Sequence, residues 1–203
     1  MSGLNPSSRG QNMPMSAMRK LIPFANKAKT ERGLELVRLN LGQPDIETPE
    51  PYWDAVENFR STKGNLVAYA PSQGRPELVE ALVKYYGDCG INFTKDQIIG
   101  TIGGCEAILI AFMAICDPGD EIVVFEPYYS NYSGLAAMAG VTLVPVPTFV
   151  KDGYHLPARE EIEKAITNKT RGIMYASPGN PTGTVYSKEE LQLLIDVCKA
   201  KSK

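Results

Sequence analysis

An alternation of apolar runs and helix-forming segments begins near Gln97 and constrains the fold of this chain more than any other feature. Ile122 to Phe125 is a continuous apolar run, which is typical of a strand covered on both faces of a sheet. Strands that alternate with helices form mostly parallel sheets with helices on both sides. The sequence therefore predicts an α/β fold, with three α/β/α layers around a mostly parallel sheet. The expected strands are 98–102, 122–125, 141–146 and 172–175, and the expected helices are 107–116, 130–139, 159–166 and one that starts at the capping box Ser187-Lys188-Glu189-Glu190.

The part of the chain before Gln97 has a less regular pattern. Residues 1–15 are rich in Ser, Gly, Asn and Pro, which favours a flexible arm. An amphipathic helix over 16–32, ended by Gly33, and a loose strand over 34–41 are expected to follow. Thr48 and Pro49 predict the start of a short helix that runs to Phe59, and Pro76 predicts the start of another.

Composition excludes several classes of function. The net charge of −2 provides no basic surface, so nucleic acid is not expected as a partner. No run reaches the ~18 apolar residues that a membrane span needs. The cysteines show no CxxC pair, which favours a reducing, cytoplasmic location over a disulfide framework. They are Cys89, Cys105, Cys116 and Cys198.

The chain has a single histidine, His155. An HExxH zinc motif is therefore impossible, no metal site is expected, and a Ser-His-Asp triad would have to use this residue. Its Gly-Tyr-His-Leu-Pro context is typical of a surface strand or turn, so we expect a structural role for it.

Gly103-Gly104-Cys105 joins an expected strand to an expected helix. The backbone N–H groups and dipole of a helix N-terminus bind anions, and a phosphate is the natural guest. The alternative is that the two glycines only allow close strand–helix packing. The segment matches neither the Walker loop nor the dinucleotide fingerprint GxGxxG.

Two further loops follow strands at the carboxyl edge of the predicted sheet, where open α/β sheets bind their ligands. Tyr128 and Tyr129 follow the strand 122–125, and such a ring either stacks on a planar ligand or merely covers the sheet end. Asn180 follows the strand 172–175 and offers a side-chain amide. The Asn180-Pro181 bond is a candidate cis peptide. Gly42 could bring a bare backbone N–H to a substrate carboxylate.

Together these loops are similar to the N-terminal half of the fold-type I pyridoxal-phosphate aminotransferases, the class I/II group that includes aspartate aminotransferase. The similarity runs from about Ser16 to the end of the chain, with the motifs in the family's order. The matching stretches are Leu39-Asn40-Leu41-Gly42-Gln43-Pro44-Asp45-Ile46-Glu47-Thr48-Pro49, Tyr69-Ala70-Pro71-Ser72-Gln73-Gly74, Gly103-Gly104-Cys105-Glu106-Ala107, Asp117-Pro118-Gly119-Asp120-Glu121 followed by Pro127-Tyr128-Tyr129, and Asn180-Pro181-Thr182-Gly183.

The resemblance implies a role for each matching position. Gly103, Gly104 and Cys105 would bind the phosphate of pyridoxal 5'-phosphate, and Tyr129 would stack on its ring. Asn180 would donate to the phenolic oxygen of the cofactor and contact the substrate, whose carboxylate Gly42 would help to hold. Tyr69 would reach the cofactor of the partner subunit in a homodimer. Relatives commonly carry Lys, Thr, Ser or Ala at the position of Cys105. A thiol at a helix N-terminus can have a lowered pKa, but we expect a passive small residue there.

The resemblance also implies domain bounds and a missing part. Residues 16–48 would belong to a small α+β domain, and 49–203 would form an incomplete large cofactor-binding domain. The family's catalytic lysine, which forms a Schiff base with the cofactor, would lie beyond Lys203, so no catalytic residue is expected in this chain. Later strands of the family's sheet would separate the strands present here. The isolated polypeptide is therefore expected to fold poorly or to aggregate, because its strand edges are unpaired.

Three functions remain open. In the first, the chain is part of an aminotransferase that moves an amino group between an L-amino acid, aspartate-like or aromatic, and a 2-oxo acid. The last helix has no Gly or Pro stop before Lys203, which supports this interpretation. In the second, it is a non-catalytic, half-length protein that binds a phosphate compound, a cofactor or a partner. In the third, it belongs to a pyridoxal-phosphate lyase on the same fold.

Overall fold

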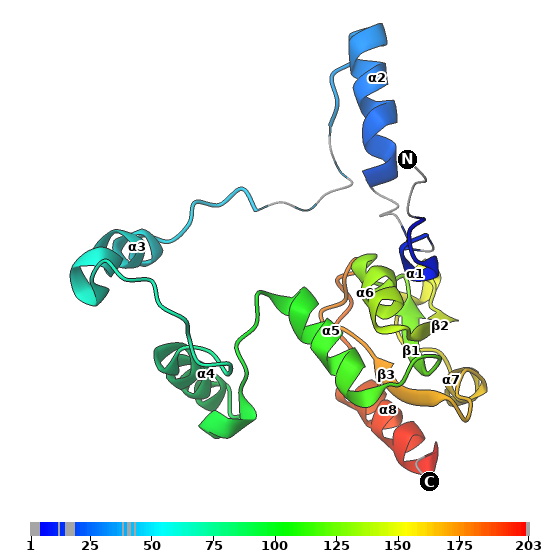
Figure 1. Cartoon of the computed structure of the whole chain (residues 1–203). Coiled ribbons are helices and arrows are strands. Elements are labelled where there is room, and N and C mark those ends of the chain that lie inside the picture. The colour runs from blue at the N-terminus through cyan, green and yellow to red at the C-terminus, as the bar shows by residue number, and fades with distance from the viewer. Residues whose placement is uncertain are drawn as a thin grey trace. The chain divides into compact units, whose positions relative to one another are not determined.

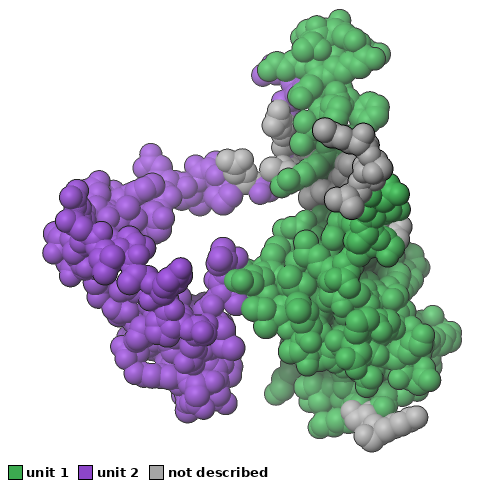
Figure 2. All heavy atoms as spheres, viewed as in Figure 1, with its two compact units in different colours: residues 1–34, 103–203 green, residues 35–102 purple. Residues whose placement is uncertain are grey.

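The computed structural model describes residues 5–11, 13–14, 19–37, 39, 42 and 44–201. The chain divides into two compact units, shown in different colours in Figure 2. Unit 1 comprises residues 1–34 and 103–203, and unit 2 comprises residues 35–102. Each is described by itself. The domain bounds expected at residues 15 and 48 stay a prediction.

Unit 1 contains a parallel sheet of three strands (Figure 1). The strands are β1 (Glu121–Glu126), β2 (Thr142–Pro147) and β3 (Thr170–Met174), in the order β2-β1-β3. Val123 of the central strand lies opposite Val144 on one side and Ile173 on the other. Three of the expected strands are thus confirmed, each within two residues of its predicted start.

Two expectations about the sheet are wrong. The strands 122–125, 141–146 and 172–175 are direct neighbours, because β1 forms parallel ladders with both β2 and β3, and no further strand is needed between them. Residues 98–102 are not a strand, and Ile102 is 91% exposed. An apolar run becomes a strand only where a neighbouring strand completes its ladder, and the described residues of unit 2 offer none. The loose strand over 34–41 is likewise absent at 34–37 and 39, and residues 38, 40 and 41 lie outside the described part.

Helices cover both faces of the sheet, as the sequence predicts. One face packs against α5 (Gly104–Ile115) and α6 (Asn131–Ala139), in a cluster that includes Ile122 and Val124 of β1. The other packs against α7 (Arg159–Lys164) and α8 (Lys188–Lys201), in a cluster that includes Val123 and Phe125. Successive side chains of a strand point to opposite faces, so β1 contributes to both cores.

Local signals set the helix ends in unit 1. Gly140 ends α6 in the left-handed region, at φ 74°. Ser187 and Glu190 form the predicted capping box, in which the Ser187 N–H donates to Glu190 Oε2 and the Glu190 N–H to Ser187 Oγ. At the amino ends of β1 and β3, the buried Asp120 accepts hydrogen bonds from the Asp117 N–H and from Arg171 of β3. This pairing holds the turn before β1 against β3.

The N-terminal elements of unit 1 are α1 (Ser8–Gln11), the 3-10 turn η1 (Arg19–Leu21) and α2 (Ile22–Arg32). Gly33 ends α2 at φ 61°, as predicted. The expected apolar stripe is not buried, since Phe24 is 73% exposed, and residues 16–18 lie outside the described part.

Unit 2 contains α3 (Glu50–Lys63), α4 (Pro76–Asp88) and the turn η2 (Lys95–Gln97). The start of α3 differs from the prediction, because Pro49 rather than Thr48 is the cap residue, and the helix runs past Phe59 to Lys63. Another 3-10 turn, η3 (Val150–Asp152), belongs to unit 1. Within the described ranges, no helix has the length and apolarity of a membrane span, and no group of His, Cys, Asp and Glu side chains is arranged to hold a metal ion.

Candidate functional site

The carboxyl ends of β1 and β3 lead into the loops that carry the predicted site residues. A small pocket, with a cavity volume of about 30 Å³, opens at this edge of the sheet. It is lined from several segments: the residues after β1, the turn before α7, and the loop between β3 and α8. The lining includes Pro127, Tyr132, Tyr154, Met174, Asn180 and Tyr186. This is the position at which open α/β sheets bind ligands.

Asn180 lies at the surface of this pocket. The Asn180-Pro181 bond is cis, as predicted, and so are Glu126-Pro127 and Ser177-Pro178. Within the described part of the chain, the Asn180 side chain has no hydrogen-bond partner of its own. Its amide can therefore donate to a bound molecule.

Tyr129 and Cys105, which come from different loops, lie close together. Asn131 joins them, because its Nδ2 donates to the Tyr129 hydroxyl at 2.7 Å and lies 3.8 Å from Cys105 Sγ. The expected ring-stacking position and the expected phosphate-binding position are thus neighbours in the folded chain. Sequence reasoning missed Asn131, although its place two residues after Tyr129 at the start of a helix was a usable signal.

The N-terminus of α5 carries the two glycines of the expected phosphate site. Gly103 is its cap residue, at φ 80°, and no side chain caps the helix. A Cβ atom built on Gly103 or Gly104 meets nothing within 4 Å, so close packing against a neighbour does not require either glycine. Nearby, Ser130 Oγ is buried and has no hydrogen-bond partner among the described residues. An anionic or polar group would satisfy these features, and a phosphate fits them.

Tyr132 is a second residue that the sequence analysis missed. Its ring stacks on Tyr128 at a centroid distance of 6.1 Å and meets Tyr129 edge-on at 5.5 Å. Tyr132 also lines the pocket that holds Asn180, so it links the Tyr129 position to that pocket. Burial, together with the charges of Tyr129 and Cys105, raises the pKa of the Tyr132 hydroxyl. The Tyr-x-x-Tyr spacing, one helical turn, could have identified it.

Gly42 and Tyr69 belong to unit 2 and are described within it alone. Tyr69 is fully exposed and lines a hollow together with Lys63 and Arg75. Glu77 bonds to both of these cations, which lowers its pKa to about 2, with the Lys63 hydrogen bond as the largest cause. A Cβ built on Gly42 meets nothing within 4 Å. The roles expected for Gly42 and Tyr69 stay predictions.

His155 lies in an exposed segment before α7, and the structural role expected for it stays a prediction. Its Nδ1 lies 3.0 Å from Glu190 Oε2, and half of its side chain is exposed. None of the residues that line the pocket is a lysine or a histidine.

Comparison with known proteins identifies a family and several relatives that this chain resembles. The family model for aminotransferase class I and II matches residues 35–203. An aspartate/prephenate aminotransferase of Thermus thermophilus is 38% identical over 92% of this chain and 49% of the relative. A protein of Streptomyces griseus described as a probable aspartate aminotransferase is 36% identical, over 94% of this chain and 90% of that protein. A solved structure of a mutant Thermus thermophilus aspartate aminotransferase superposes with a TM-score of 0.87 at 36% identity, over 98% of this chain and 51% of that structure.

The chain matches only part of the length of two of these relatives. The chain spans about half the length of the Thermus thermophilus relative and of the solved structure. The matched half contains the sheet of unit 1 and the loops that carry Cys105, Tyr129 and Asn180.

Proposed function

The chain belongs to the class I and II aminotransferase family, and from this premise we propose that it carries the N-terminal part of a binding site for pyridoxal 5'-phosphate. The complete enzyme would move an amino group between an L-amino acid and a 2-oxo acid. The observation that carries this proposal is the joining of Tyr129 and Cys105 by Asn131, close to the pocket that holds Asn180. Three features that a planar, phosphorylated cofactor needs thus lie in one unit.

Each position has its own task in this proposal. The N-terminus of α5, at Gly103, Gly104 and Cys105, binds the phosphate, and Tyr129 offers a flat ring to the pyridine. The free amide of Asn180 donates to the ring oxygen. When bound, pyridoxal phosphate supplies an electron sink for the bond that breaks at the substrate α-carbon.

Other parts of the proposal rest on the resemblance to the family. The backbone of Gly42 would contact the substrate carboxylate, and Tyr69 would reach the cofactor of the partner subunit in a homodimer. None of the four cysteines forms a disulfide in the structure, which supports a cytoplasmic location.

Aspartate is the first substrate to test. The Thermus thermophilus relative is named for aspartate and prephenate, and it matches nine tenths of this chain. Transfer from an aromatic amino acid is the second choice. A lyase reaction on the same fold has no specific observation in its favour.

Titration of the 203-residue chain with pyridoxal phosphate, followed by absorbance and by equilibrium dialysis, tests the site. Tyr129→Ala should weaken binding about 2- to 13-fold, because an aromatic contact contributes about 0.5–1.5 kcal/mol. Asn180→Ala should also weaken it, whereas Tyr85→Ala, which removes an exposed ring from α4, should not. Equal affinity for all four proteins would contradict the proposed site.

The same titration separates cofactor binding from covalent attachment. No lysine lines the pocket, so binding to this chain should be non-covalent. After borohydride reduction and digestion, mass spectrometry should find no single lysine modified in high yield. One stoichiometric lysine adduct would contradict the prediction that this chain has no catalytic lysine.

A further inference from the structure

The loop that carries Asn180 is closed on itself. We call residues 177–187 the Asn180 loop. The Gly179 N–H donates to the Thr184 carbonyl at 2.8 Å, and the Gly183 N–H donates to the Gly179 carbonyl at 2.7 Å. The Tyr186 N–H donates to Ser177 Oγ at 3.0 Å. The loop therefore has a defined shape, and its attachment to the rest of unit 1 decides where Asn180 lies.

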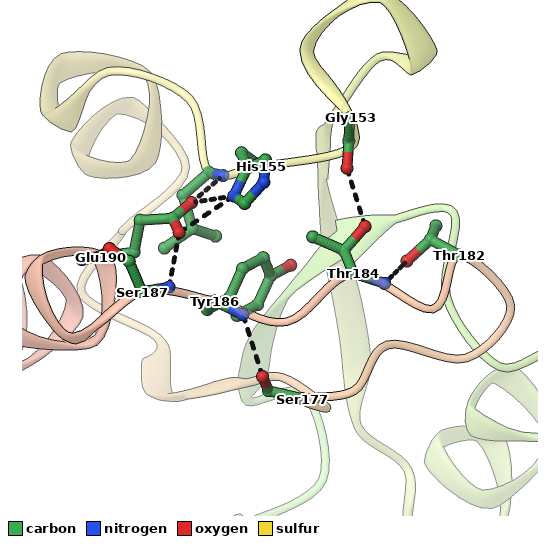
Figure 3. Close-up of polar contacts among 9 residues, drawn as sticks. Gly153, His155, Ser177, Thr182, Thr184, Tyr186, Ser187 and Glu190 are labelled. Atoms are coloured by element: carbon green, nitrogen blue, oxygen red, sulfur yellow. Dashed lines mark hydrogen bonds and ion pairs between the residues drawn. The ribbon is translucent and has the colours of Figure 1, made fainter.

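Two side chains attach this loop to residues 153–156, which we call the His155 turn (Figure 3). The Thr184 hydroxyl donates to the Gly153 carbonyl at 2.7 Å. The Glu190 carboxylate accepts from the Leu156 N–H at 2.8 Å through Oε1 and from the Ser187 N–H at 2.7 Å through Oε2. Both attachments include a backbone atom of the turn.

The Glu190 position requires an ionised carboxylate. Both oxygens accept backbone N–H groups, and His155 Nδ1 lies within 3.1 Å of each of them. A carboxylate only accepts, so Nδ1 carries the hydrogen and donates. Glutamine would present an N–H₂ group to one of the backbone N–H groups and would lose that bond. The Glu190 side chain is only 17% exposed, so water cannot fully replace a lost bond.

Both attached segments line the pocket. Tyr154 of the His155 turn and Asn180 and Tyr186 of the loop are among its lining residues. We propose that Glu190 and Thr184 are positioning residues, which clamp the Asn180 loop to the His155 turn and so hold the Asn180 amide in place for the cofactor. The part that concerns the cofactor rests on the proposed function. The clamp itself is a property of the free chain.

Hydrogen–deuterium exchange on the full chain, resolved to single amides by NMR, tests the clamp without any cofactor. Glu190→Gln should speed exchange of the Gly179, Gly183 and Leu156 amides about tenfold, as expected for the loss of one charge-assisted hydrogen bond. Glu189→Gln is the matched control, because it removes the same charge from the same helical turn without a contact to the His155 turn. It should change these rates less than about twofold.

A purely structural role for Glu190 as the cap of α8 gives a different result. Ser187→Ala removes the hydroxyl that accepts the Glu190 N–H, so it should speed exchange in the first turn of α8 and leave Gly179 unchanged. If Glu190→Gln behaves like Ser187→Ala, or like Glu189→Gln, the proposal is wrong. If Glu190→Gln also speeds exchange in β1, the variant Thr184→Val provides the deciding test of the clamp. Faster exchange confined to the Asn180 loop in Thr184→Val supports the clamp, and unchanged exchange in that loop refutes it.

A titration with pyridoxal phosphate then tests the link to the cofactor. Glu190→Gln should bind several-fold more weakly than Glu189→Gln. Failure of the unaltered chain to bind would count against the proposed function, whereas the exchange rates would still decide the clamp. Normal binding by a variant with a loosened loop would refute the positioning of Asn180.

Discussion

Replacing Tyr132 with leucine should weaken both the fold of unit 1 and the site beside Tyr129. Tyr132 is 9% exposed, stacks on Tyr128 and meets Tyr129 edge-on. Each such ring pair contributes about 0.5–1.5 kcal/mol beyond area burial, so the loss of two pairs should lower the free energy of unfolding by about 1–3 kcal/mol. Leucine keeps the site apolar, which limits the loss to the ring contacts.

Urea unfolding followed by circular dichroism, in dilute solution, measures this loss. Tyr132→Phe keeps both ring pairs and removes only the hydroxyl, so it should lose less than about 1 kcal/mol. Tyr85→Leu provides a second control, because Tyr85 forms a similar edge-on pair with Tyr86 but is 61% exposed. Its effect should stay within about 0.5 kcal/mol.

The same variants should separate in pyridoxal phosphate binding. Tyr132→Leu removes the ring behind Tyr129 and should weaken binding, whereas Tyr132→Phe should bind normally. If the leucine and phenylalanine variants have the same stability and the same affinity, then the two ring contacts do not support the site.

Three further outcomes follow from the fold. Ile162→Ala, at a fully buried position of α7, should lower the free energy of unfolding by about 2–5 kcal/mol. Ile195→Ala, at a half-exposed position of α8, should lower it by less than about 0.5 kcal/mol. Equal losses for the two variants in urea unfolding would contradict the packing. Burial raises the pKa of Glu190, but the N–H groups of Ser187 and Leu156 and the nearby His155 outweigh it, so the net pKa is lowered. Among the groups facing this carboxylate are His155, Tyr186 and Glu189. The stabilisation by the ionised Glu190 carboxylate is complete above the ordinary glutamate pKa of about 4.3 and is lost as pH falls through the lower folded value. Hydrogen exchange in the Asn180 loop, corrected for its intrinsic pH dependence, should therefore accelerate only in that acid range in the unaltered chain. It should not accelerate there in Glu190→Gln. The open edge of β3 should make the chain self-associate with rising concentration in size-exclusion chromatography with light scattering, and a monodisperse monomer with one cooperative transition would argue against this.

The parts of the fold that local chemistry determines could be predicted from the sequence. The apolar run at Ile122 to Phe125 forms a strand buried on both faces, and the cis bond before Pro181 and the capping box at Ser187 and Glu190 are present. Residues 98–102 are also mostly apolar, but in the described part of the chain no strand lies beside them, so their composition alone misled the prediction. A strand depends on its neighbours as much as on its own residues.

The candidate site shows the same limit. Asn180 and Tyr129 follow strands, and position in the chain was enough to propose them as site residues. Thr184 and Glu190 bond to atoms 31 and 34 residues away, and no local pattern indicates such contacts. Glu190 was recognised only as a helix cap, because its second set of contacts exists only after the chain has folded.

The attachment of the Asn180 loop to backbone atoms has an evolutionary consequence. The Gly153 carbonyl and the Leu156 N–H remain available whatever side chains the turn carries, so the turn can diverge while Asn180 keeps its place. Tyr154 is the position best suited to such divergence, because it lines the pocket and takes no part in the clamp. Because Tyr154 has a φ of 59°, only glycine, asparagine and aspartate can replace it at little cost in free energy. Selection at this one residue could therefore reshape the pocket wall and leave the amide that faces the cofactor unchanged.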